Sequence, residues 1–347
     1  MDYTEPTFND ALFYQKRKHG KYRVVAAPSI GAAIADTHAH IQMLPNPALA
    51  LAKALVWGVD FVCDICDVCE DAETAFENLS TYQADAIPLA HDLVASTLLL
   101  PDDDPVVAAT KEQIRERVSH EGWDDGVRIR IAVGCHPHNA KDFDGEALSR
   151  LRTLLSDPRV CAIGEIGLDY HYDFSPRPVQ VEVFRTQIRM AHELGLPISL
   201  HIREAHDEAL RILTEEGFPT SGVLLHCFNL DPQTLEPWLE HDCFVAFGGP
   251  LTFKPSDYVR ASARLVPKDR LLTETDAPYM APEPMRGVVC GPQHTVYTAD
   301  VLARTLGYEA SDARAELFGQ LMDNAKGLLD RGPLDWQCIP AKLIEKD

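Results

Sequence analysis

The sequence predicts an α/β fold, a (β/α)8 TIM barrel with an insertion between its second and third strands. Short apolar segments recur along the chain, several ending in a histidine, glutamate or aspartate and most followed by a helical pattern. The 347 residues suffice for one large barrel, or for two smaller domains. The recurrence of one strand-and-helix design favours the single barrel, and the hydrophobic content of 46% is ample for its core.

The first strand is expected at about 32–37 and leads into His38 and His40. Side chains two positions apart leave the same face of a strand, so the two imidazoles would point together. Converging imidazoles are good ligands for a borderline divalent metal. Two polar residues in a loop would give the same pattern. Similar residues at later strand ends favour the metal site.

The second strand is expected at about 59–64 and the third at 128–134. The stretch between them is much longer than one barrel helix requires, and it carries helical patterns. We interpret about 66–127 as an insertion within the barrel rather than as a second domain. A lid, a substrate contact or a partner surface are the roles open to it.

Three cysteines, Cys63, Cys66 and Cys69, have the spacing of a metal or cluster motif. Such sites normally need four ligands, and no fourth cysteine follows nearby. Buried core thiols are the simpler interpretation. The total of nine cysteines is odd, which favours reduced thiols over a disulfide framework.

The later strands repeat the design of the first, separated by helical patterns such as those around 145–156 and 178–195. The seventh strand, 243–249, ends in glycines and carries no ligand residue. The residues of metal-ligand type at the strand ends are His38, His40, Glu165, His201, His226 and Asp276. Because the carboxyl ends of barrel strands meet at one face, these six residues indicate one shared metal site.

Two further residues lie close to these ligands in sequence. Arg203 follows His201 by two positions, and a guanidinium there suits a phosphate or carboxylate group. An ion pair with Glu204 or Asp207 is the structural alternative. Glu274 precedes Asp276 by two positions and is expected deeper in the barrel, where it would orient a ligand.

The net charge of −21 argues against broad binding of duplex nucleic acid, because the overall field repels polyanions. Two bound divalent cations would reverse the sign locally, so a single strand end could still enter the site. No apolar run is long enough to cross a bilayer and no secretory signal is visible. We therefore expect a cytoplasmic protein with no membrane contact.

The chain divides into three expected segments. Residues 1–30 form an N-terminal extension, 31–328 the barrel, and 329–347 a C-terminal tail capping it. The extension carries a basic patch, which indicates either a solvated segment or a phosphate contact near the mouth of the site. Its residues are Lys16, Arg17, Lys18, Lys21 and Arg23.

The motifs DTHAH, GCHPH, GEIGLDYH, HIR, HCF and TETDAPY occur in this order. As a set they resemble the TatD family of metal-dependent hydrolases, within the amidohydrolase-like TIM barrels, from about residue 34 to 328. The resemblance implies that His38, His40 and Asp276 hold one metal ion, that His201 and His226 hold another, and that Glu165 bridges them.

The resemblance also implies substrate contacts. It sets His136 beside the site, facing substrate rather than metal, and Tyr170 over the pocket with its neighbours Asp169 and His171. We expect Phe228 and Arg203 to contact substrate as well.

The activity implied is metal-dependent hydrolysis of DNA from a 3′ end, with single-stranded DNA as the expected substrate. Asp276 would accept the proton of the attacking water and Glu165 would bridge the two cations. The histidine-rich ligand set favours zinc, manganese or another transition ion over magnesium, although magnesium could also support activity.

Where the family has an Arg-x-Asn-x-Pro-like stretch, this chain reads MRGVVCGPQHT, which keeps Arg286 and Pro292 but lacks the asparagine. That departure leaves open hydrolysis of a small ester, amide or lactone at the same site. An inactive metal-binding or interaction module is the remaining alternative. The presence of Asp276 argues against it.

Overall fold

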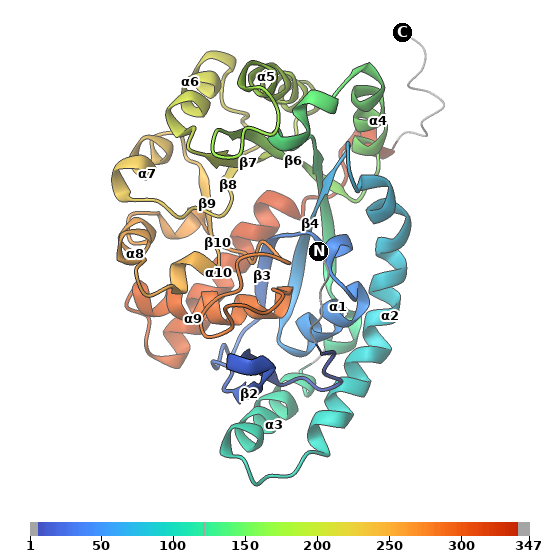
Figure 1. Ribbon diagram of the computed structural model, residues 1–347, viewed down its shortest axis with the longest axis vertical. Helices are drawn as coiled ribbons and strands as arrows, with labels where there is room; N and C mark the ends of the chain where they lie inside the picture. Colours follow the sequence, from blue (N-terminus) through green and yellow to red (C-terminus); the bar gives the residue numbers. More distant parts are fainter. Residues whose placement is uncertain (1–5, 121, 339–347) are drawn as a thin grey trace.

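The computed structural model describes residues 6–120 and 122–338. At its centre, eight parallel strands curl into a nearly closed barrel, with helices around the outside (Figure 1). The strands lie side by side in chain order, and the predicted (β/α)8 fold is confirmed. They are β3 (Ile34–Ala39), β4 (Val59–Asp67), β5 (Arg128–Gly134), β6 (Val160–Asp169), β7 (Ile198–Arg203), β8 (Val223–Leu225), β9 (Phe244–Phe247) and β10 (Leu271–Thr273).

The barrel closes between its first and last strands through side chains as well as backbone. The Thr273 hydroxyl donates to the Ala35 carbonyl at 2.8 Å, and the Thr37 hydroxyl donates to the Thr273 carbonyl at 3.1 Å. Beyond β10, the Asp276 amide donates to the His38 carbonyl at 2.9 Å. These bonds bring the two ends of the barrel sequence together at the carboxyl face.

Most strand residues are buried because both faces of the sheet are covered. In β4, Phe61, Cys63 and Ile65 belong to a small cluster inside the barrel, while Val62 and Cys66 join the larger core beneath the helices. This alternation is the two-residue period of a strand. It also confirms that Cys63 and Cys66 are core thiols.

Ten α-helices lie in the described part of the chain, most of them between strands as the sequence predicts. Asn46 and Asp144 cap two of them with their side chains, and Gly195 ends a third in the left-handed conformation that glycine favours. The helices are α1 (Pro47–Val56), α2 (Ala72–Leu98), α3 (Pro105–Val118), α4 (Gly145–Leu155), α5 (Arg177–Leu194), α6 (His206–Glu216), α7 (Pro232–Leu239), α8 (Asp257–Ala263), α9 (Thr295–Thr305) and α10 (Ser311–Leu329).

The region between β4 and β5 contains the long helix α2 and the returning helix α3. Figure 1 shows α2 along the side of the barrel and α3 beside the N-terminal hairpin. Arg117 of α3 pairs with Asp60, at the start of β4 and therefore at the barrel end opposite the strand carboxyl ends. The bulk of the insertion consequently lies away from the face where the ligand residues gather.

The chain before the barrel forms a two-stranded antiparallel hairpin, β1 (Phe13–Lys16) and β2 (Tyr22–Val25). After α10, the segment to Cys338 returns to the barrel, where the side-chain amide of Gln337 donates to the Val160 carbonyl at 3.1 Å. The expectations for residues 1–5 and 339–347 lie outside the described residues. Among the helices described, none combines the length and apolarity needed to span a membrane.

Candidate functional site

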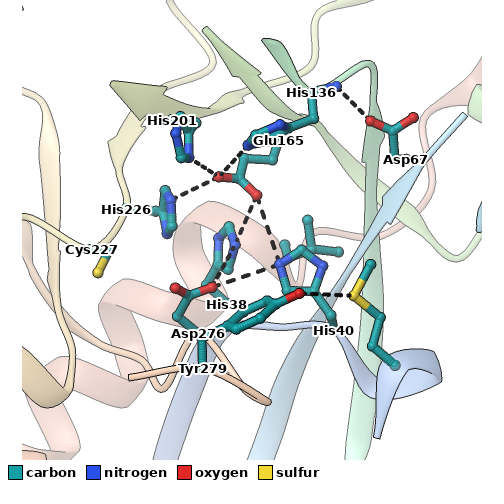
Figure 2. Close-up of polar contacts among 12 residues, drawn as sticks. His38, His40, Asp67, His136, Glu165, His201, His226, Cys227, Asp276 and Tyr279 are labelled. Carbon is teal, nitrogen blue, oxygen red and sulfur yellow. Dashed lines mark hydrogen bonds and ion pairs between the residues drawn. The ribbon is translucent and has the colours of Figure 1, made fainter. Parts of the chain in front are cut away.

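Six polar side chains converge at the carboxyl face of the barrel (Figure 2). Three belong to the strands β3, β6 and β7, and the others to the loops after β3, β8 and β10. We call them the donor cluster: His38, His40, Glu165, His201, His226 and Asp276. The sequence prediction that these six residues share one site agrees with this arrangement.

Glu165 lies at the centre of the donor cluster, and its two carboxylate oxygens face different histidines. Oε1 is 2.8 Å from Nε2 of His226 and 2.5 Å from Nδ1 of His201. Oε2 is 3.3 Å from Nε2 of His38 and 3.8 Å from Nε2 of His40. A single carboxylate thus divides the histidines into two pairs.

Asp276 completes the pair on the Oε2 side. Its Oδ1 is 3.9 Å from Nε2 of His38 and 3.7 Å from Nε2 of His40. Ligands about 2.0–2.1 Å from one tetrahedral cation lie roughly 3.3–3.5 Å from each other. The spacings on this side are close to that value, whereas His201 and His226 contact Glu165 directly.

Ring nitrogens without a hydrogen bond indicate that a ligand belongs in this site, although Nε2 of His38 lies 3.3 Å from Oε2 of Glu165. His38 is fully buried, yet neither of its ring nitrogens has a hydrogen-bond partner among the described residues. Buried polar groups are nearly always hydrogen-bonded, and imidazole nitrogen is a ligand for zinc and other transition ions. The donor cluster therefore fits divalent metal ions.

Electrostatics favour an ionised carboxylate at the centre. Burial would raise the pKa of Glu165, but nearby histidines, His226 first and then His136, His201 and His38, hold that pKa well below its usual range. Asp169 behaves similarly: burial opposes ionisation, while hydrogen bonds from His138 and His201 hold its pKa far below normal. Both groups are anionic acceptors at neutral pH.

Buried residues behind the donor cluster orient it. Glu274 is fully buried; its Oε1 accepts the Cys227 amide at 2.6 Å and lies 3.6 Å from Nδ1 of His226. Asp36 accepts the Thr275 amide at 2.9 Å and the Thr275 hydroxyl at 2.6 Å. The deep position expected for Glu274 is the one observed.

The backbone at Asp276 adopts a left-handed conformation with φ of 58°. Residues other than glycine, asparagine and aspartate rarely adopt this conformation. Uncommon backbone conformations of this kind are typical of functional sites. The Asp276 carbonyl accepts the Tyr279 amide at 2.7 Å, which holds the turn.

A pocket of about 530 Å³ opens above the donor cluster. His136 lines it, with Nε2 3.5 Å from Oε1 of Glu165, and Arg203 lines it from the end of β7. Tyr170 and Phe228 do not belong to its lining. The chain turns after Asp169, so the Tyr170 ring packs against the core beside Arg177, and Phe228 is buried next to Phe247.

Other lining residues carried no signal in the sequence. Asp67 and Glu70 line the pocket because β4 runs three residues beyond its expected end, to Asp67. Tyr172 reaches it from the turn after β6, and Met43 and Tyr279 lie on the side of β3 and β10. After Asp64 the residues Ile65, Cys66 and Asp67 do not alternate, so the sequence did not indicate the full length of β4.

Cys69 is separate from the two core thiols that precede it. Its Sγ is 3.9 Å from Sγ of Cys135, and with Asp67 these two form a further group of metal-ligand type beside the pocket. All nine cysteines are free thiols, as the odd number suggested. None of the five basic residues predicted as a patch on the N-terminal segment is among the described residues lining the pocket.

The barrel and the donor cluster at its carboxyl face define the class: a metal-dependent barrel hydrolase. A family model described as "TatD related DNase" matches residues 35–329. The chain belongs to the TatD family of metal-dependent hydrolases.

Individual relatives agree with this assignment. An uncharacterized metal-dependent hydrolase of Bacillus subtilis, YabD, is 41% identical over 175 residues, which cover 50% of this chain and 69% of the relative. A 3′-5′ ssDNA/RNA exonuclease, TatD of Enterobacter lignolyticus, is 34% identical over 203 residues, or 58% of this chain and 78% of that one. The crystal structure of YJJV, a TatD homologue from Escherichia coli, superposes with a TM-score of 0.65 at 22% identity over 86% of this chain and 98% of that chain, which supports the fold.

Proposed function

We propose that this hydrolase is a 3′–5′ exonuclease that shortens single-stranded DNA with two divalent cations. The observation that carries the proposal is the division of the histidines by Glu165, one pair at each carboxylate oxygen. A carboxylate between two groups of donors suits a pair of cations that share it. The exonuclease named among the relatives supports the choice of substrate.

The ligand assignment within this proposal follows the two sides of Glu165. His38, His40 and Asp276 would hold one cation, His201 and His226 would hold the other, and Glu165 would be shared by both. Zinc or manganese suits the imidazole donors best, with magnesium as a weaker candidate. When bound, two such cations acidify a water molecule and neutralise the charge of a phosphodiester.

The chain's own residues then move the proton and position the strand. Asp276 accepts a proton from the attacking water and returns it to the leaving 3′ oxygen as the phosphorus–oxygen bond breaks. The products are a nucleoside 5′-monophosphate and a strand with a new 3′ hydroxyl. Arg203 and His136, at the mouth and beside Glu165, contact the phosphate being released.

The test is degradation of a 5′-labelled single-stranded oligonucleotide by protein stripped of metal and reloaded with Zn²⁺, Mn²⁺ or Mg²⁺. We expect a ladder that shortens from the 3′ end, absent without metal and in Asp276→Asn. Asparagine tolerates the left-handed backbone, so this variant tests the carboxylate rather than the turn.

Asp257→Asn is the matched control, because the side chain of this aspartate on α8 is 96% exposed and does not line the pocket. It should cleave like the wild type. Absence of cleavage by protein that binds two metal ions per chain would exclude the nuclease, and the assay would then turn to small esters, amides and lactones.

A further inference from the structure

Two aromatic side chains stand exposed at one edge of the pocket. Tyr172 is 48% and Phe174 is 56% exposed, and their rings lie nearly parallel, 9° apart, with centroids separated by 5.2 Å. We call this pair the aromatic platform. Two large rings that stack on each other while both remain open to solvent leave flat apolar surface uncovered.

The platform is held in place rather than free to move. His138 packs edge-on against both rings, 5.6 Å from Tyr172 and 4.8 Å from Phe174, and its Nε2 is 2.7 Å from Oδ2 of Asp169. Asp169 Oδ1 also accepts the Tyr172 amide at 2.9 Å. The Arg203 guanidinium lies 4.6 Å from the Tyr172 ring, a cation–π contact.

The platform is continuous with the donor cluster. Asp169, which anchors it, is 3.2 Å from Nε2 of His201, and the other ring nitrogen of His201 contacts Glu165. Tyr172, His138 and Arg203 all line the pocket that contains the donor cluster. A chain bound with a phosphate at the cations would therefore run past these rings.

Few cationic side chains line this mouth. Among the described residues that line the pocket, Arg203 is the one lysine or arginine. The carboxylates there are Asp67, Glu70, Asp169, Glu165 and Asp276. A phosphate backbone finds few cationic side chains here, and the whole chain carries −21.

We propose that the aromatic platform binds the bases of a single strand next to the scissile phosphodiester. This inference rests on the proposed nuclease function. Every base has a flat face, so stacking holds a strand without regard to sequence. The platform thus supplies affinity for base-bearing single strands, while the cations and Arg203 hold the phosphate.

The experiment compares two single-stranded substrates, an oligothymidylate and the same strand with abasic tetrahydrofuran residues at its 3′ end. The variants are Tyr172→Ala, Phe174→Ala and Tyr172→Phe. Tyr258→Ala is the matched control, because Tyr258 on α8 is 47% exposed and does not line the pocket. Steady-state cleavage gives KM and kcat separately.

On oligothymidylate, each alanine variant should raise KM by between about fivefold and 150-fold, equivalent to 1–3 kcal/mol per stacked base, with kcat little changed. Tyr172→Phe keeps the flat ring and should recover most of the affinity that Tyr172→Ala loses, and Tyr258→Ala should match the wild type. On the abasic strand, all variants should be equal. If the alanine variants raised KM equally on both substrates, or on neither, the proposed role of the platform would be overturned.

Binding separates failure of the platform from failure of the nuclease. Fluorescence anisotropy measures the affinity of labelled oligothymidylate for the metal-loaded proteins. The affinity should be lower for Tyr172→Ala than for the wild type, whether or not the strand is cut. Raising salt from about 50 to 200 mM should change the affinity far less than the 10³-fold or more expected for a protein with many phosphate contacts. Absence of binding to wild-type protein would overturn both proposals, whereas cleavage with tight, platform-independent binding would overturn the platform alone.

Discussion

The donor cluster and the aromatic platform adjoin the same pocket, which Tyr172 lines, but they differ in burial and in polarity. In the cluster, His38 and Glu165 are buried and polar, and the ring nitrogens of His38 lack hydrogen-bond partners within the described chain. In the platform, Tyr172 and Phe174 are aromatic and about half exposed. The two regions suit different ligands. The ring nitrogens of the donor cluster can bind cations, and the exposed rings of the platform can stack on flat bases.

The difference separates two kinds of mutational effect. Substitutions in the donor cluster should lower turnover of every substrate, because they alter the reacting centre. Substitutions in the platform should alter KM for strands that carry bases and leave turnover unchanged.

The largest effect is expected for Glu165→Gln. The neutral amide cannot bridge two cations, so the variant should bind fewer metal ions and lose about 10³-fold or more in kcat on every phosphodiester. Metal content per chain and oligonucleotide cleavage measure the two effects. Glu146→Gln, on an 82% exposed side chain of α4, is the control and should be unaffected. Full metal content with near-normal turnover would contradict the bridging role.

A smaller effect is expected for Glu274→Gln, which keeps the size of the side chain but removes its charge. Glu274 lies 3.6 Å from Nδ1 of His226 and accepts the Cys227 amide, so it orients a ligand from behind. Partners of this kind typically contribute about 10- to 100-fold in metal affinity. Competition with a chelator measures the affinity, and excess metal should restore most of the turnover. An unchanged affinity would show that His226 is oriented without this charge.

At the mouth, Arg203→Ala should raise KM for oligonucleotides by about 10- to 150-fold, since a charge-assisted contact to phosphate contributes roughly 1.5–3 kcal/mol. The kcat should be nearly unchanged, because Arg203 is exposed and lies outside the donor cluster. Unlike the platform variants, Arg203→Ala should raise KM equally for base-bearing and abasic strands. A loss confined to base-bearing strands would instead assign Arg203 to the platform.

The smallest effect on turnover is expected at His294, a buried histidine whose Nδ1 accepts the Gly291 amide at 2.9 Å. Burial and the nearby Lys53 lower the pKa of His294 to about 3. The unfolded chain takes up this proton near pH 6.5 and the folded chain does not, so the contribution of the neutral ring to stability is lost as pH falls below about 6.5. Between pH 7 and pH 5 the loss should be about 2 kcal/mol.

Urea unfolding of metal-free wild type and His294→Gln at both pH values measures this loss. The free energy of unfolding should differ less between pH 7 and pH 5 for the variant than for the wild type. Oligonucleotide cleavage at pH 7 should be the same for both proteins. Identical pH dependence of the two unfolding free energies would contradict the assignment. His294 thereby serves as a comparison for His38, being similarly buried but hydrogen-bonded to the chain.

The sequence predicted the barrel and the members of the donor cluster for one physical reason. Parallel strands end at the same face, so a histidine or carboxylate after each apolar run, such as His201 after 196–200, must meet the others there. The deep position of Glu274 was expected from its place two residues before Asp276, whereas its proximity to His226 was not predicted.

The surroundings of the cluster were less predictable because turns have no period. Tyr170 was expected over the pocket, but the chain turns after Asp169, and Tyr172 lines the pocket instead. The proximity of Cys69 to Cys135, 66 positions away, depends on two adjacent strands and a register that the sequence does not reveal. The docking of α3 at the opposite end depends on tertiary contacts such as that of Arg117 with Asp60.

The closure of the barrel has a consequence for biosynthesis. Asp36 and Thr275, joined by a hydrogen bond behind the donor cluster, are 239 positions apart in the chain. At translation rates of about 5–20 residues per second, Asp276 follows His40 out of the ribosome by roughly 10 to 50 s. A nascent chain therefore carries the His38–His40 pair long before the other donors exist, so the proposed site for the cation of this pair would be complete only after synthesis has passed Asp276.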